Sequence, residues 1–322
     1  MNEEQEDNKP SDYRWREYLR PWFAVLSLLS LLWVGWILWR AWPQAQAAIH
    51  HFDGRWLGLT LAGTTLGGYL MFEVFYMLFR QGVGPLHKKR ELAHLFFVGQ
   101  LMKHLPGRVW GIAYQAAQTT HASLRQWLGL NVAYMLLTMF FSVWVALIII
   151  LYFLSKLWFL TAFLGGLALY FALCNIRIFE ILRVFLIYSP FANIVQWINS
   201  LEVYTCSSLT QKLRIIFLSV ASWFCYYLAW GFFGYAWPNL GFSGGLQICA
   251  YYTLAWLVGY LAFIFPSGAG IRELVFLYFA KDFPPDALAA MVVFGRLVLM
   301  ITDILLGTFF IVPKFLNFRK AK

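Results

Sequence analysis

The chain has 322 residues, of which 61% are hydrophobic, 20% aromatic and 12% charged, and its formal net charge is +10. This composition excludes an ordinary soluble domain and indicates an integral membrane protein. The apolar runs are continuous and about twenty residues long, which predicts α-helices and excludes an outer-membrane barrel with its short alternating strands. The basic residues gather at the ends of these runs, which points to membrane topology and anionic lipid rather than nucleic acid.

Residues 1–20 carry mixed charges, and we expect a polar cytoplasmic tail there. Seven apolar runs follow that each predict a membrane-spanning helix: 21–42, 57–79, 127–153, 158–174, 214–236, 246–265 and 287–312. Two stretches, 92–118 and 178–198, are apolar but less continuous. We therefore predict an all-α polytopic membrane protein with about 7–8 transmembrane helices. Residues 21–315 form its single transmembrane domain, and 316–322 form a basic cytoplasmic tail.

The positive-inside rule places the basic clusters, and with them both termini, in the cytoplasm. These clusters lie within residues 14–20, 80–90, 177–183, 212–214 and 314–322. The stretch 92–118 then begins and ends on the cytoplasmic side. It must be a re-entrant hairpin that turns near residues 104–107, or a surface helix.

The same count of membrane crossings requires residues 238–286 to begin and end on the outer side of the membrane. A second re-entrant hairpin, turning near residues 266–270, satisfies this requirement. Alternatively, 246–265 crosses fully and 271–281 returns through the membrane as a short half-helix. Two re-entrant hairpins from opposite faces are the arrangement that an inverted-repeat transporter presents at its binding site.

The first candidate site combines basic side chains with a Pro-Gly break. Its candidate headgroup-binding residues are Lys103, His104, Pro106, Gly107 and Arg108. The lysine and the arginine could hold a phosphate, and a helix that starts after the glycine would direct its free N–H groups at the same anion. The alternative is a cytoplasmic amphipathic helix whose basic side chains reach lipid phosphates.

The second candidate site is a turn that follows the apolar run 246–265. Its candidate headgroup-binding residues are Pro266, Ser267, Gly268, Gly270, Arg272 and Glu273. The small residues permit close backbone approach, the arginine can bind a phosphate through two N–H groups, and the glutamate can balance that charge. In the alternative, the two charged residues pair elsewhere and only hold the turn. Because ionisable groups at membrane depth are costly, we favour the binding site.

Three more ionisable residues lie inside predicted spans: Glu73, Arg296 and Asp303. Arg296 and Asp303 are seven residues apart, so they share one face of a helix. They could form an intramembrane charge network with Glu273 or Glu73, although a purely structural interhelical pair explains them equally well. Glu73 could also be a proton-coupling carboxylate.

Enzymatic motifs are missing from the sequence. It has no His-Glu-x-x-His, no Gly-x-Ser-x-Gly, no P-loop and no Asp-x-Asp of the kind that binds a metal and a sugar nucleotide. The histidines also lack a metal-binding spacing. We therefore expect no catalytic residue, no cofactor and no metal site.

Both candidate sites carry a family resemblance. The segment 99–110 matches a turn of the form Lys-aromatic-x-Pro-Gly-basic-x-Trp, and residues 266–273 match Pro-x-Gly-x-Gly-x-x-Glu. In these motifs the chain resembles the lysylphosphatidylglycerol synthase transmembrane-region family, the membrane module that forms the flippase half of bacterial multiple peptide resistance factors. The resemblance spans most of residues 20–315. His104 departs from it because an aromatic residue is usual there, and residues 131–134 lack the usual acid.

The resemblance implies a protein of the bacterial or archaeal inner membrane that translocates a phosphate-containing lipid. The cargo would be an aminoacyl phospholipid, a polyprenyl-phosphate lipid or a glycolipid. These 322 residues contain no soluble aminoacyl-transfer domain, so we do not expect lysyl-lipid synthesis.

Two alternatives stay open. The first is a non-transporting membrane partner of a glycosyltransferase or lipid synthase in envelope biogenesis. The second is a membrane transferase that uses an isoprenoid-phosphate donor, with Glu273 or Glu73 as base. The sequence leaves the oligomeric state undetermined.

Overall fold

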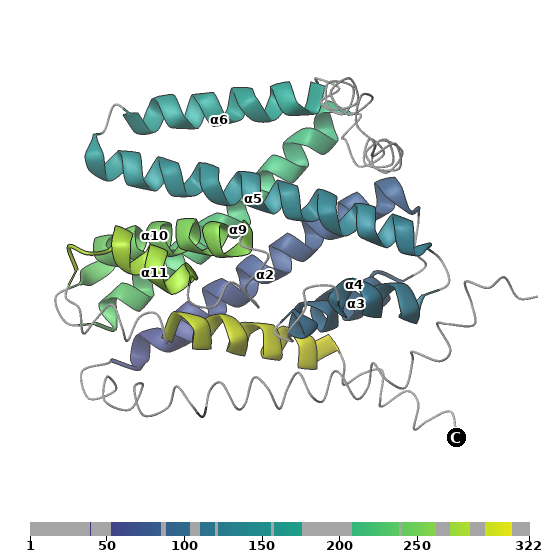
Figure 1. Cartoon of the computed structure of the whole chain (residues 1–322), viewed down its shortest axis with the longest axis horizontal. Helices are drawn as coiled ribbons and strands as arrows, with labels where there is room; N and C mark the ends of the chain where they lie inside the picture. Colours follow the sequence, from purple (N-terminus) through teal and green to yellow (C-terminus); the bar gives the residue numbers. More distant parts are fainter. Residues whose placement is uncertain are drawn as a thin grey trace, which may run out of the picture.

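A computed structural model of the chain describes residues 39, 53–84, 88–103, 110–119, 122–155, 158–175, 208–237, 240–261, 271–283 and 294–310. Within these ranges all regular secondary structure is helical (Figure 1). The labelled helices are α2 (Arg55–Gly82), α3 (Lys89–Met102), α4 (Trp110–Gln118), α5 (Leu124–Leu154), α6 (Trp158–Asn175), α9 (Leu209–Tyr235), α10 (Gly241–Leu261) and α11 (Ile271–Phe279). A further helix covers residues 294–310.

Three helices, α2, α5 and α9, are long and apolar enough to cross a membrane. They contain 28, 31 and 27 residues. At about 1.5 Å per residue each exceeds the hydrocarbon core of about 30 Å. The prediction of a helical membrane protein is confirmed to this extent.

The predicted spans correspond closely to the helices where the structure describes them. The runs 57–79, 127–153, 158–174 and 214–236 match α2, α5, α6 and α9, and 246–265 and 287–312 match α10 and the 294–310 helix. The runs 21–42 and 178–198, with the two tails, lie outside the described residues. Polar caps set two of the starts. Ser123 and Gln126 form a capping box before α5, and Ser208 accepts a hydrogen bond from the backbone of Gln211 in α9.

Helices α2 and α9 form an antiparallel pair along their whole length. At one end the backbone N–H of Asp53 donates to the carbonyl of Ala236 at 3.0 Å. At the other, the Gln81 side-chain amide donates to Gln211 at 3.2 Å. Between them the backbones approach closely, since a Cβ on Gly63 would lie 2.9 Å from a side chain of α9. Helices α3, α5 and α10 pack directly on this pair.

Helices α3 and α4 form a short hairpin that is inserted into the bundle. They have 14 and 9 residues, so each is too short to cross a membrane. Ten residues of α3 are buried against its neighbours. The helices touch at two glycines, because a Cβ on Gly111 would lie 2.6 Å from the carbonyl oxygen of Gly99. The predicted turn between them, residues 104–107, lies outside the described residues.

Helix α11 lies alongside the middle of α10. The rings of Tyr252 and Phe276 are 5.7 Å apart, and those of Tyr251 and Phe279 stack at 6.2 Å. With 21 residues α10 is about 31 Å long, whereas α11 has 9 residues. The turn that would join them, residues 262–270, lies outside the described residues.

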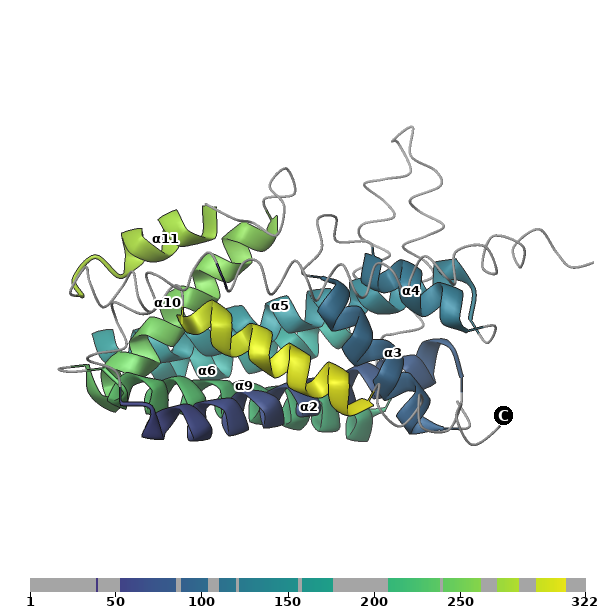
Figure 2. The same cartoon turned by 90° about the horizontal axis from the view of Figure 1, so that it is seen from below.

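The 294–310 helix joins two hydrophobic clusters. One cluster is built on α2 to α5, and the other on α9, α10 and α11. At its start Phe294 packs edge-on against Trp237, with ring centroids 5.6 Å apart. At its end Phe310 stacks on Phe97 of α3 at 5.0 Å. Figure 2 shows this helix running from the region of α10 toward α3.

Candidate functional site

The clearest polar contact inside the bundle is an ion pair between Lys103 and Asp303. Lys103 is the residue that follows the last turn of α3, and its Nζ lies 2.9 Å from Asp303 Oδ2 and 3.2 Å from Gln100 Oε1. The Asp303 side chain is 15% exposed and that of Lys103 is 48% exposed. A carboxylate shielded in this way needs a counter-charge, and the half-exposed lysine supplies it.

Two tyrosines lie within electrostatic range of Asp303. They are Tyr134 of α5 and Tyr226 of α9. The Tyr226 ring fits against α2 only because Gly67 has no side chain, since a Cβ there would lie 2.9 Å from the ring. Tyr134 is held by edge contacts with the rings of neighbouring phenylalanines on α2 and α3. Four helices therefore bring one cation, one carboxylate and two phenols together.

The first candidate motif reaches this centre through Lys103. Tyr260, six residues before the second motif, lies within electrostatic range of Tyr134. Most of the predicted headgroup-binding residues themselves lie outside the described residues: His104, Pro106, Gly107, Arg108, Pro266, Ser267, Gly268 and Gly270. Glu273 belongs to α11, but the structure does not describe its side chain. Of the described motif residues, Lys103 is the one that contacts the Asp303 carboxylate.

Arg272 occupies a different environment, on the contact between α10 and α11. Its guanidinium lies over the ring of Tyr252, 5.4 Å from the centroid. Tyr252 in turn packs against Trp230 of α9. Since Tyr252 and Tyr260 are eight residues apart, about 12 Å of helix separates these two tyrosines of α10.

Two acidic residues of the predicted charge network each have a lysine partner. Asp303 pairs with Lys103, whereas Glu73 pairs with Lys89 at the start of α3. Arg296 is partly buried on the 294–310 helix and follows a glycine that packs against an indole of α9. The two acidic residues that we expected in one network therefore have different partners.

A second set of buried polar contacts fixes the α3–α4 hairpin. His94 Nε2 is 2.9 Å from the Tyr114 hydroxyl, and its Nδ1 is 3.2 Å from the carbonyl oxygen of Phe310. A carbonyl only accepts, so Nδ1 carries the proton and Nε2 accepts from the tyrosine. On α5 the Asn131 amide donates to Gln115 Oε1 at 2.7 Å. These contacts connect the hairpin to the helices on either side.

Sequence reasoning overlooked the tyrosines and these amide contacts. Tyr134 and Tyr226 lie within long apolar runs rich in aromatic residues, where nothing separates them from tyrosines that face lipid. The sequence offers one signal for them. Each tyrosine hydroxyl lies in the middle of a predicted span, where a polar group in a membrane generally has a polar partner.

This centre can hold a charged or zwitterionic group. Lys103 and the two phenols can donate to anionic oxygens, and Asp303 can accept from an ammonium or hydroxyl group. Among the described residues, no three His, Cys, Asp or Glu side chains gather as metal ligands would.

Comparison with known proteins gives no match: no family model, curated protein or solved structure is similar to the chain. The family resemblance carried by the two motifs therefore stays a prediction.

Proposed function

We propose that the protein is a lipid translocator of the bacterial or archaeal inner membrane. The observation that carries this proposal is the Lys103–Asp303 ion pair, set among α3, α5, α9 and the 294–310 helix. Charged groups placed at membrane depth are costly, and a structural role alone would be served by apolar packing. A lipid headgroup is the polar ligand that such a centre meets in a bilayer.

The chemistry of the centre matches a headgroup that carries both an anion and a donor. Its phosphate would replace Asp303 as the partner of Lys103, and the released carboxylate would accept from an ammonium or sugar hydroxyl of the same headgroup. This complementarity fits an aminoacyl phospholipid or a phosphate-containing glycolipid better than a bare polyprenyl phosphate. The tails would remain in the bilayer while the headgroup crosses.

The finer topology belongs to the same proposal. It comprises about 7–8 spans, the α3–α4 hairpin entering from the cytoplasmic face, and both termini in the cytoplasm. Arg272 would act at the other end of the headgroup path, where it now lies over Tyr252. Rocking of the two halves would expose the centre to each leaflet in turn.

The test is transport by purified protein in liposomes that carry a labelled aminoacyl phospholipid, cardiolipin, polyprenyl phosphate or glycolipid. A membrane-impermeant reagent measures how fast each headgroup becomes exposed. We expect Lys103→Gln to slow exposure about tenfold or more, because hydrogen bonds to charged groups contribute about 1.5–3 kcal/mol. The matched control is Lys281→Gln, on an exposed lysine after α11.

The single variant leaves Asp303 without its counter-charge, which could unfold the protein. The double variant Lys103→Gln/Asp303→Asn removes both charges and avoids this cost. We expect it to fold and insert normally but to transport poorly. Wild-type transport by a folded double variant would refute the role of this centre. If wild-type protein moves none of the lipids, the non-transporting partner becomes the better interpretation.

A further inference from the structure

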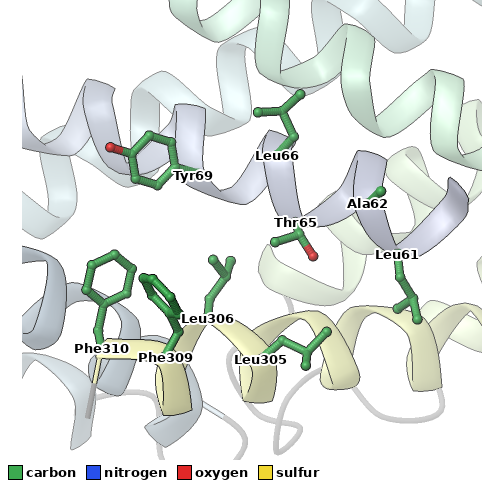
Figure 3. A pocket seen from close by; sticks show the side chains of 9 residues that line it. All are labelled: Leu61, Ala62, Thr65, Leu66, Tyr69, Leu305, Leu306, Phe309 and Phe310. Atoms are coloured by element: carbon green, nitrogen blue, oxygen red, sulfur yellow. The ribbon is translucent and has the colours of Figure 1, made fainter. Parts of the chain in front are cut away.

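An apolar groove of about 620 Å³ lies between α2 and the 294–310 helix. Five residues of α2 from Leu61 to Tyr69 line one wall, and four residues from Leu305 to Phe310 line the other (Figure 3). The lining is aliphatic and aromatic except for the hydroxyls of Thr65 and Tyr69. Its volume is typical of sites that bind small ligands.

The groove exists because the two helices meet only along their inner sides. There, Thr64 and Thr302 share a hydrogen bond of 2.8 Å. One turn on, a Cβ on Gly68 would lie 3.0 Å from Leu306. Phe309 projects on the outer side and is 70% exposed. The groove therefore opens on the outer side of this contact, where Phe309 projects.

One end of the groove is polar. Tyr69, the last lining residue of α2, forms a side-chain hydrogen bond with Glu73. Glu73 pairs with Lys89, and the ammonium of Lys89 also lies 5.1 Å from the ring centroid of Tyr76. The Lys89 side chain remains 42% exposed, so it can still reach a ligand.

The charge around this end is predominantly basic. Four exposed basic side chains lie there: Arg80, Lys88, Lys89 and Arg90. Two acidic residues, Glu73 and Glu91, offset them only in part. By the positive-inside rule this is the cytoplasmic end of α2.

The length of the groove matches a single leaflet. Its eight-residue path along α2 covers about 12 Å. One leaflet contributes about 15 Å of hydrocarbon, half of the core. A chain lying in the groove would therefore place its headgroup near Lys89, where an anion finds complementary charge.

We propose that this groove binds one acyl chain of an anionic phospholipid, with the phosphate at Lys89. The site is separate from the Lys103–Asp303 centre, and its occupation does not require that this lipid be transported. Glu73 contacts both Tyr69 and Lys89, and it thereby holds the lysine at the mouth of the groove.

The experiment uses phosphatidylglycerol with a photoactivatable diazirine in one acyl chain, added to the full-length protein in nanodiscs. Cross-linked peptides are mapped by mass spectrometry. We expect labelling between Leu61 and Tyr69 and between 305 and 310. Unlabelled phosphatidylglycerol should compete about fivefold better than phosphatidylcholine, the preference that one lysine provides at a membrane surface.

Variants separate the groove from general lipid contact. Thr65→Trp fills the groove and should abolish the labelling. The matched control Leu136→Trp, on the exposed face of α5, should leave it unchanged. Lys89→Gln should remove the preference for the anionic lipid, while Lys89→Arg retains it and the pair with Glu73.

Three results would overturn the proposal. The first is labelling spread evenly over the exposed residues of α5 and α6. The second is equal competition by the two lipids. The third is disulfide cross-linking of Thr65→Cys to cysteines placed in residues 21–42, with no lipid labelling of the groove, which would make that predicted span the occupant. Loss of transport with intact labelling would count against the translocator and not against this site.

Discussion

The contact between α3 and α4 makes a quantitative prediction for Gly111→Ala. A Cβ on Gly111 would lie 2.6 Å from the carbonyl oxygen of Gly99, where 3.4 Å is ordinary contact, so the hairpin must open by about 0.8 Å. Overpacking of this kind costs about 1–3 kcal/mol. Alanine recovers at most about 1 kcal/mol through its better helix propensity. We expect a net loss of about 1–2 kcal/mol in the free energy of unfolding.

Two other glycines provide matched controls. A Cβ on Gly58 in α2 would meet no neighbouring group within 4 Å, so Gly58→Ala should be neutral or stabilising by up to about 1 kcal/mol. A Cβ on Gly99 would meet the flexible end of Gln115 at 3.0 Å, so Gly99→Ala should fall between the two.

The assay is unfolding of the three variants in one detergent, by titration with a denaturing detergent and tryptophan fluorescence. The decisive quantity is the difference between Gly111→Ala and Gly58→Ala, expected at about 1–3 kcal/mol because both alanines gain the same helix propensity. Because Lys103 follows α3, Gly111→Ala should also slow lipid exposure in liposomes. Equal stability of the two variants would refute the close packing of the hairpin.

Two further predictions address the hairpin support and the topology. Asn131→Leu removes the amide that donates to Gln115, a residue only 2% exposed, and should destabilise the protein by about 1–3 kcal/mol in the same unfolding assay; an unchanged midpoint would contradict the bond. In a variant without the four native cysteines, Ser155→Cys between α5 and α6 should react with an impermeant maleimide from outside, and Ser208→Cys before α9 only from the cytoplasm. The reverse pattern would overturn the assigned orientation.

The sequence predicts the helices well because length and apolar continuity are sufficient to define a membrane span. The 127–153 run lies within α5, and the 214–236 run ends one residue after α9. It misses the first turn of α9 because Leu209 to Leu213 are interrupted by polar residues, and the Ser208 cap rather than hydropathy sets that start.

The partners of buried charges are harder to predict. A helix that is apolar on all sides gives no signal for which face meets which neighbour. From spacing alone, Asp303 could have paired with any base on several helices. Its pairing with Lys103 depends on the position of α3 and α4 against the other helices. The contact between Gly99 and Gly111 and the hydrogen bonds of His94 set that position.

The two ends of the 294–310 helix are anchored to different hydrophobic clusters. Phe294 is fixed to the cluster of α9 to α11, Phe310 is fixed to α3, and Asp303 lies between them. Such an element acts mechanically as a strut, since it cannot follow one cluster without pulling on the other. Any relative tilt of the two clusters must therefore be absorbed along its length, close to the only acidic residue it carries. A displacement of either end of this helix would therefore be transmitted to the Lys103–Asp303 ion pair through the helix itself.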